Sequence, residues 1–373
     1  MINNISRKAI FTGDTCFVGC LENKSFEIEY PNKNFDFLIT NIEQSIYSSS
    51  IKNKSTVLSS ENSLIRGIGN LKPTHIGLAN NHIHDGGLDN IGYIKRIIET
   101  SGSKVFGAGS NKDEAEQPTL LSNNIWILGC CAFNKPTLNN IALATDSKPG
   151  LMAGDYKSIS LQLNKHKEKD FIIFIHWGVE HVPIPHPYTR NLAKKILYHQ
   201  NVKAIIGMHP HIILPSERFY NKPVYYSLGN FLFPNFVIEP PTQLSKKREY
   251  FKETYSYHKV NELTLKKWRL KNRISLICEF DTHNHSFKES FMIQSFSSSS
   301  VKPLKGIYYL LFFIKYHFKK LILKLVPNNN FYKSTYFLVS NTVKFTRWSY
   351  IAIKLFNQFG YKHVWNILKR ILN

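Results

Sequence analysis

Short apolar runs recur through the first 230 residues of the chain, and each run ends on polar residues. Examples are AIFTGD, THIGLANNH, FIIFIHWG and AIIGMHPH, in which roughly four to six apolar positions follow one another without clean alternation. Strands with this pattern are typically buried on both faces, as they are when helices cover a sheet.

Segments with helical spacing lie between several of these runs. Their apolar positions are Ile91, Ile94, Ile97 and Ile98 in GGLDNIGYIKRIIETSG, and Leu192, Ile196 and Leu197 in YTRNLAKKILYHQN. Apolar residues three or four positions apart share one face of a helix, so both segments are predicted to be amphipathic helices. Alternating strands and helices predict an α/β core.

Polar side chains gather where the predicted strands end. In α/β folds, ligands bind outside the carboxyl ends of the strands, so one rim of the fold could collect these groups. The residues at or just past such ends are Asp14, Glu43, Asn81, His82, His176, His209 and His211. Carboxylate, amide and imidazole groups form a mixed oxygen and nitrogen set that divalent Mn, Fe, Zn or Mg can use.

The segment GMHPH places two histidines two positions apart. If it stays extended, His209 and His211 project to the same side and can bind one ion or two adjacent ions, and Pro210 stiffens the spacing. A histidine taken alone is more often structural than a ligand. The joint placement at strand ends is what favours metal binding here.

Composition divides the chain unevenly. A 373-residue chain with 43% hydrophobic residues can bury a large core, and we expect one large domain plus an extension. The formal net charge is +22, and 13 Lys or Arg with no Asp or Glu fall within residues 301–373. We predict a domain at 7–290, a serine-rich linker at 291–303 and a basic tail at 304–373. Within the domain, residues 236–273 are charged and poorly periodic, which indicates an excursion or cap.

The cysteines and the N-terminal segment indicate a compartment. Five cysteines without C-x-x-C spacing form neither a disulfide framework nor a zinc ribbon. The segment MINNISRKAIFTGD has no charged region followed by a long apolar stretch, so no signal peptide is expected. Both features favour a cytoplasmic protein.

The basic tail allows three interpretations. Its apolar run at 307–314 is well short of the ~20 residues that span a bilayer. Aromatic and aliphatic residues interleaved with Lys and Arg are typical of amphipathic helices that lie on an anionic membrane surface. A helical appendage packed on the domain is the equal alternative. Nucleic acid is a weaker third partner, because the charge suits it but no recognition motif is present.

Six ordered motifs make the sequence resemble a known family. They are FTGDT, NIEQSI, LANNHIHDGG, FIHWGVEH, IIGMHPHIILPSE and YYSLGNFLF. They resemble the CapA family of capsule and poly-γ-glutamate synthesis proteins, whose domain belongs with the calcineurin-like metallophosphoesterases. Over roughly residues 7–290, the resemblance implies a four-layer α/β/β/α sandwich and a site for two divalent metal ions, Mn, Zn, Fe or Mg.

The resemblance also implies roles for single residues. Asp14 would hold the first metal, Glu43 would take the bridging position, and Asn81 would bind the second metal. His82 would be the acid that protonates the leaving group. The remaining ligands would be His176, His209 and His211. Asp85 would orient His82 or, equally, cap the helix that starts near Gly87.

Two positions depart from the phosphoesterase pattern. Cys16 stands where a histidine is usual, and Glu43 where a bridging aspartate is usual. Cys16 is either a thiolate ligand or a buried residue outside the site, and we prefer the second. Ser227 and Asn230 belong to the last motif and are expected near the site.

The motifs therefore lead to two functions. The first is a metal-dependent hydrolase that acts on a phosphoester or related polymer intermediate in capsule, exopolysaccharide or poly-γ-glutamate synthesis. The second is a non-catalytic, membrane-peripheral assembly factor for an envelope polymer machine. Metal binding and turnover distinguish them, because a fold does not by itself establish catalysis.

Overall fold

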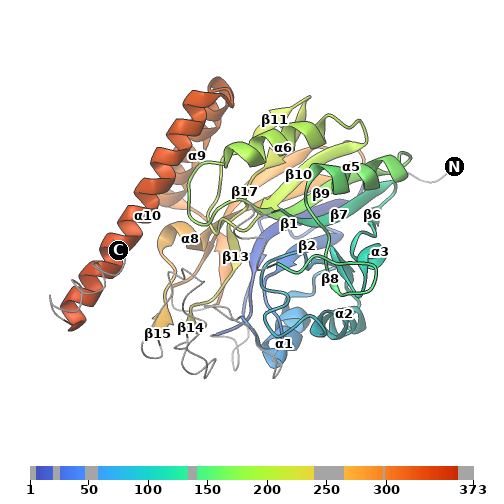
Figure 1. The fold of residues 1–373 in the computed structure, drawn as a ribbon, viewed down its shortest axis with the longest axis horizontal. Coiled ribbons are helices and arrows are strands. Elements are labelled where there is room, and N and C mark those ends of the chain that lie inside the picture. Colours follow the sequence, from blue (N-terminus) through green and yellow to red (C-terminus); the bar gives the residue numbers. More distant parts are fainter. Residues whose placement is uncertain are drawn as a thin grey trace.

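The computed structural model describes residues 6–19, 26–46, 58–132, 141–238, 264–296 and 299–359. Two stacked sheets form its centre (Figure 1). The first sheet contains β1 (Lys8–Thr15), β2 (Phe37–Ile42), β3 (His75–Gly77), β4 (Lys104–Phe106), β13 (Asn230–Leu232), β16 (Ile274–Asp281), β17 (Phe287–Gln294) and β18 (Val301–Pro303). β1 to β4 run parallel, and β16, β17 and β18 extend the sheet in antiparallel pairs from β1.

The second sheet is also parallel at its centre. It contains β6 (Thr119–Ser122), β7 (Ile125–Ala132), β9 (Asp170–Trp177), β10 (Val202–Met208), β11 (Glu217–Phe219) and β12 (Lys222–Tyr225). β7, β9, β10 and β12 are parallel, while β6 and β11 are antiparallel edges. The parallel strands of each sheet therefore end together at one edge.

Helices cover the outer face of each sheet. Figure 1 shows α1 (Glu61–Leu71) and α2 (Asn90–Thr100) below the strands, and α5 (Tyr156–Lys165) and α6 (Pro187–Leu197) above them. At the start of α1, the Ser60 side chain accepts a hydrogen bond from the Ser63 N–H. At the start of α5, the Asp155 side chain accepts one from the Ser158 N–H in the same way. Helix, sheet, sheet and helix form four layers.

The core clusters follow the layers. β9 shows the principle, because alternate residues of a strand face opposite sides. Ile172 and Phe174 pack between the sheets with Phe11 of β1, whereas Ile173 packs against Ile196 of α6. β9 is therefore buried on both faces, which explains its continuous apolar run. The predicted four-layer α/β/β/α architecture is confirmed.

Shorter elements complete the domain. They are β5 (Ala108–Gly109), paired with β8 (Gly150–Leu151), and α3 (Lys112–Ala115). β14 (Phe236–Ile238) pairs with β15 (Thr264–Lys266), and α8 (Leu270–Arg273) precedes β16. The predicted excursion at 236–273 thus includes a pair of short antiparallel strands, while its part at 239–263 lies outside the described residues.

The predicted linker at 291–303 is wrong. Residues 287–294 form β17 and residues 301–303 form β18, and these strands pair in the first sheet. The serine-rich stretch connects two antiparallel strands, and the N–H of Ser295 donates to the carbonyl of Ser300 at 2.9 Å. Serine and proline mark a turn equally well inside a sheet and between domains, so composition alone did not distinguish the two.

The basic tail is helical, as predicted. α9 (Gly306–Leu325) and α10 (Asn330–Phe359) follow the last strand, and residues 360–373 lie outside the described part. Tyr316 joins the cluster between the sheets, and Leu323 and Tyr332 join the cluster under α6. In the described part of the chain, no helix is long and apolar enough to cross a membrane.

Candidate metal centre

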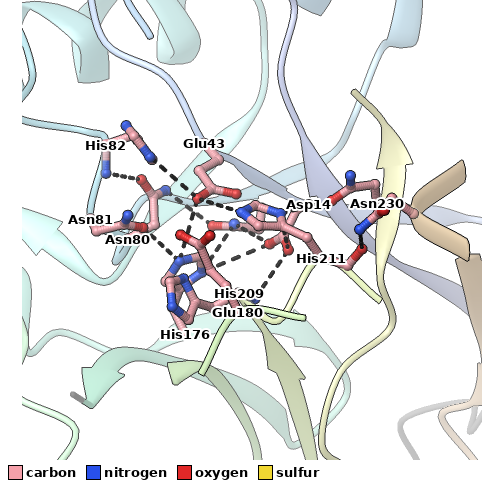
Figure 2. A network of polar contacts seen from close by, with 12 residues as sticks. Asp14, Glu43, Asn80, Asn81, His82, His176, Glu180, His209, His211 and Asn230 are labelled. Carbon is pink, nitrogen blue, oxygen red and sulfur yellow. Dashed lines mark hydrogen bonds and ion pairs between the residues drawn. The ribbon is translucent and has the colours of Figure 1, made fainter. Parts of the chain in front are cut away.

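The candidate site lies at the carboxyl ends of the parallel strands of both sheets (Figure 2). The first sheet and the loops after its strands supply Asp14, Asn41, Glu43, Asn80, Asn81 and His82. The second sheet and the loop after β10 supply His176, His209 and His211. The structure brings together the residues that the sequence assigned to metal binding and proton transfer, although they are far apart along the chain.

Asp14 is a fully buried carboxylate at the end of β1. Its Oδ1 accepts a hydrogen bond from Asn41 Nδ2 at 2.9 Å, and its Oδ2 accepts one from the N–H of His209 at 3.0 Å. The preceding Gly13 allows close approach, because a Cβ there would lie 1.8 Å from the carbonyl oxygen of Gly229. Both sheets therefore fix the carboxylate.

Glu43 lies one residue beyond β2 and is also fully buried. Its Oε1 lies 3.7 Å from Nε2 of His176 and 3.8 Å from Nε2 of both His82 and His211. These separations are too long for direct hydrogen bonds. Three imidazoles from three parts of the chain thus surround one carboxylate oxygen.

His82 is held by Asp85. Its Nδ1 lies 2.6 Å from Asp85 Oδ2, an oxygen that also accepts the N–H of Leu58 at 2.8 Å. A carboxylate on one ring nitrogen fixes the tautomer and leaves Nε2 directed at the site. The capping alternative for Asp85 is wrong, because α2 begins later, with Asp89 at its N-cap.

His176 reaches the site from the end of β9. Its Nε2 lies 2.8 Å from Asn81 Oδ1, and its Nδ1 lies 3.8 Å from Asp14 Oδ1 and 3.4 Å from Asn41 Nδ2. The ring therefore lies between the Asp14 side and the Asn81 side of the site, as Figure 2 shows. It can contribute to either half of a two-ion centre.

The GMHPH segment is not extended after its methionine. β10 ends at Met208, and His209 and His211 have φ values of 97° and 55°. These values lie in the left-handed region, which residues with a side chain adopt at a cost of about 1–3 kcal/mol each, mostly at functional sites. The two rings reach the same site through a tight turn, with centroids 5.9 Å apart, and not by sharing one side of a strand.

Burial sets the protonation state of the histidines. It lowers the pKa of His209 to about 3 and that of His211 to about 4, and it holds the pKa of His176 well below its usual value. The three imidazoles are neutral near pH 7 and carry a lone pair that can bind a metal. Burial also raises the pKa of Asp14 to about 7, although its two hydrogen bonds oppose the shift.

The donor set fits a divalent ion. Glu43, His209 and His211 each offer one ligand atom, and these atoms lie within 4.8 Å of one another. A zinc-like ion binds nitrogen and oxygen at about 2.0–2.2 Å, so its ligand atoms lie a few ångströms apart, as these do. His211 Nδ1 lies 2.8 Å from Asn230 Oδ1, which orients its other nitrogen as the outer partners of metal-bound histidines do.

Cys16 lies outside the ligand set. It packs in an apolar cluster with Leu58, Phe233 and Trp268, and burial raises the pKa of its thiol well above the usual value. A metal binds the thiolate form, which this environment disfavours. Ser227 shapes the adjacent turn, because its Oγ accepts the N–H of Gly229 at 3.2 Å.

Sequence reasoning missed three residues of the site. Asn41 donates a hydrogen bond to Asp14 through its Nδ2, and its Oδ1 accepts one from Asn80 Nδ2 at 3.1 Å. Glu180 lies close enough to His209 and His211 for its negative charge to oppose the lowering of their pKa values by burial. All three missed residues stand inside the motifs NIEQSI, LANNHIHDGG and FIHWGVEH, so proximity to a predicted ligand was the available signal.

Comparison with known proteins gives a family match. The sequence profile of the family described as "Bacterial capsule synthesis protein PGA_cap" matches residues 28–235. "Capsule biosynthesis protein CapA" of Bacillus anthracis is 25% identical over 212 residues, which cover 54% of this chain and 51% of that protein. "PGA biosynthesis protein CapA" of Bacillus subtilis (strain 168) is 26% identical over 163 residues, or 43% and 42% of the two chains.

The matches have a limited extent. The chain aligns with about half the length of the curated relatives it matches. Among solved structures, the calcineurin-like phosphoesterase YfkN from Bacillus subtilis aligns over 86% of this chain and 98% of that chain, with 12% identity and a TM-score of 0.36. Such a score does not establish a common fold, so the four-layer architecture depends on the sheets and core clusters described above.

Proposed function

The chain belongs to the bacterial capsule synthesis protein family PGA_cap, as its motifs predicted, and we propose that it is a metal-dependent hydrolase. The bond is a phosphoester or a related bond in an intermediate of capsule, exopolysaccharide or poly-γ-glutamate synthesis. The names of the relatives support the pathway class, because they describe capsule and PGA biosynthesis proteins.

One observation carries the proposal. Nitrogen atoms of three histidines lie 3.7–3.8 Å from a single buried oxygen of Glu43. Burial lowers the pKa of two of them, His176 and His211. Neutral imidazole and carboxylate groups are usual ligands of first-row transition metal ions. Asp14 and Asn81 add oxygen ligands on either side of His176, so we assign the site to two ions.

The chain's own residues supply positioning and a proton. Bound divalent ions would lower the pKa of a coordinated water and stabilise charge on a phosphoryl group. The side chain of His82 is 12% exposed and fixed through Asp85, so Nε2 faces the site from a stable orientation. We assign it the transfer of a proton to the leaving oxygen.

We also place the protein in the cytoplasm. In the described part of the chain, Cys16, Cys130 and Cys278 are buried thiols outside any disulfide, which reducing compartments maintain. Fusion to a reporter phosphatase that is active only after export should give an inactive fusion. An active fusion would contradict the placement.

The test combines metal analysis with turnover. Elemental analysis should find about two metal equivalents per chain, which His209→Ala/His211→Ala should lose. Reconstituted protein should hydrolyse bis-(p-nitrophenyl) phosphate, and His82→Ala should lose roughly 100-fold or more in turnover while keeping its metal. His199→Ala is the matched control, because this histidine lies in the bend after α6, beside Tyr156, and is not among the site residues.

The outcomes separate the two functions. No specific metal after reconstitution with Mn²⁺ or Zn²⁺, together with no turnover, would replace the hydrolase with the non-catalytic assembly factor. Loss of metal in His82→Ala would instead make His82 a ligand and remove its role as the acid. Loss of activity in His199→Ala would show that the assay reports folding.

A further inference from the structure

Helix α9 has two apolar faces, and only one of them is packed on the domain. On the inner face, Tyr316 and Leu323 are 5% and 3% exposed. The Tyr316 hydroxyl donates to Ser216 Oγ at 3.1 Å, and Lys320 pairs with Glu289 at 3.0 Å. This face joins the helix to the edge of the sandwich.

The outer face of α9 carries a continuous apolar stripe. With 100° per residue, its members fall within about 120° of the helix circumference. They are Ile307, Leu310, Leu311, Ile314, Phe318, Leu321, Ile322 and Leu325. Each is between 44% and 69% exposed. Single exposed apolar residues are common, whereas a contiguous stripe of this size marks an interaction surface.

Positive charge borders the stripe. Lys315 follows Ile314 on one side, and Lys324 lies on the other side next to Leu325. α9 contains no acidic residue, and residues 301–373 contain 13 Lys or Arg and no Asp or Glu. The partner must therefore offer an apolar interior to the stripe and a negatively charged surface to the lysines beside it.

We propose that the outer face of α9 docks on an anionic lipid bilayer, with the helix lying in the plane of the membrane. An apolar stripe flanked by lysines has the composition of interfacial helices. A second copy of the chain fits poorly as the occupant, because it would bring two basic surfaces together. The proposal does not depend on the metal centre.

The helix is ordered before it meets a membrane. Arg190, which is 4% exposed, donates to the carbonyl oxygens of Leu323 and Val326 at 3.0 and 3.1 Å and pairs with Glu217. These contacts hold the C-terminal end of α9 against α6. Because the stripe is preformed, binding does not carry the entropy cost of folding the helix.

Co-sedimentation with vesicles tests the proposal on the full chain. A truncation at the start of the tail is unsuitable, because Leu304, Tyr316 and Leu323 belong to the core. The test variant is Ile314→Glu/Phe318→Glu, at positions 55% and 61% exposed. The matched control, Leu161→Glu/Tyr198→Glu, makes the same charge change at positions 58% and 66% exposed on α5 and at the end of α6.

The expected result has three parts. Wild type and control should bind phosphatidylglycerol-containing vesicles, and the test variant should bind at least ten times more weakly. Neutral phosphatidylcholine vesicles and raised salt should weaken wild-type binding, because the basic border needs anionic headgroups. Circular dichroism should show the same helix content in all three proteins.

Three results would overturn the proposal. The first is no vesicle binding by wild type, and the second is equal binding by test and control variants. The third is a wild-type dimer, seen by light scattering, that the test variant converts to a monomer, since the stripe would then bind a second copy.

Discussion

His75 provides a test of the structure that is independent of the metal centre. It lies in β3, is 2% exposed and packs edge-on against Phe37. Its Nε2 lies 3.1 Å from the carbonyl oxygen of Leu120 and its Nδ1 lies 2.9 Å from Thr74 Oγ1. The perturbation is His75→Phe, which keeps a ring in the core and removes the titrating group.

The magnitude follows from the pKa. Burial lowers the pKa of His75 from 6.5 to about 4. Between these values the unfolded chain binds a proton that the folded protein does not, so stability is present above pH 6.5 and is lost as the pH falls toward 4. The full shift corresponds to about 3 kcal/mol, of which about 2 kcal/mol is lost between about pH 7.5 and pH 5.

Urea unfolding at both pH values measures the effect. At the higher pH the variant should be less stable by about 1 kcal/mol, because the carbonyl of Leu120 loses a hydrogen bond. At the lower pH it should be the more stable protein by about 1 kcal/mol. EDTA in all samples makes the other buried histidines contribute equally to both proteins. A stability difference that stays constant with pH would refute the reasoning.

Three further predictions concern the tail, the sheet and the metal. Arg190→Met should lower the free energy of unfolding by about 3 kcal/mol in urea titrations, because Glu217 is left as a buried, uncompensated charge. Gly13→Ala should reduce bound metal and cost about 1–3 kcal/mol, because the new Cβ displaces Gly229 beside the site. EDTA should lower the thermal midpoint of metal-loaded wild type but not that of His209→Ala/His211→Ala, since only a bound ion stabilises by mass action.

The sequence predicted the layers because the central strands are buried on both faces. The run FIIFI of β9 faces the other sheet with Ile172 and Phe174, and faces α6 with Ile173 and Ile175. Neither side tolerates a polar residue there, so the pattern is unambiguous. The strands at the edges of the sheets are not buried on both faces, so their sequences are less restricted. β18 has three residues, of which only Val301 is buried, and it ends in Pro303, so it resembled a linker.

The site divides in a similar way. Residue type and position at a strand end identified Asp14, Glu43 and His176, because parallel strands bring their ends together. The conformation of GMHPH could not be predicted, because it includes a contact far away in the sequence. His209 has a left-handed φ, and its N–H donates to Asp14, 195 residues earlier in the chain. Asn41 was missed because an asparagine is common at any strand end. Its significance depends on Asp14 being opposite it in the neighbouring strand.

The same close approach that forms the site also limits where its residues can come from. β1 pairs with β13, so Asp14 lies opposite Asn230, whose side chain holds His211. Gly13 permits this pairing by leaving room for Gly229. One strand pairing thus contains three parts of the site: the proposed metal ligand Asp14, Asn230, which orients His211, and the close contact between Gly13 and Gly229. The register of β1 and β13 therefore sets the geometry of the centre, and a change that shifts it should alter metal binding even when every ligand is present.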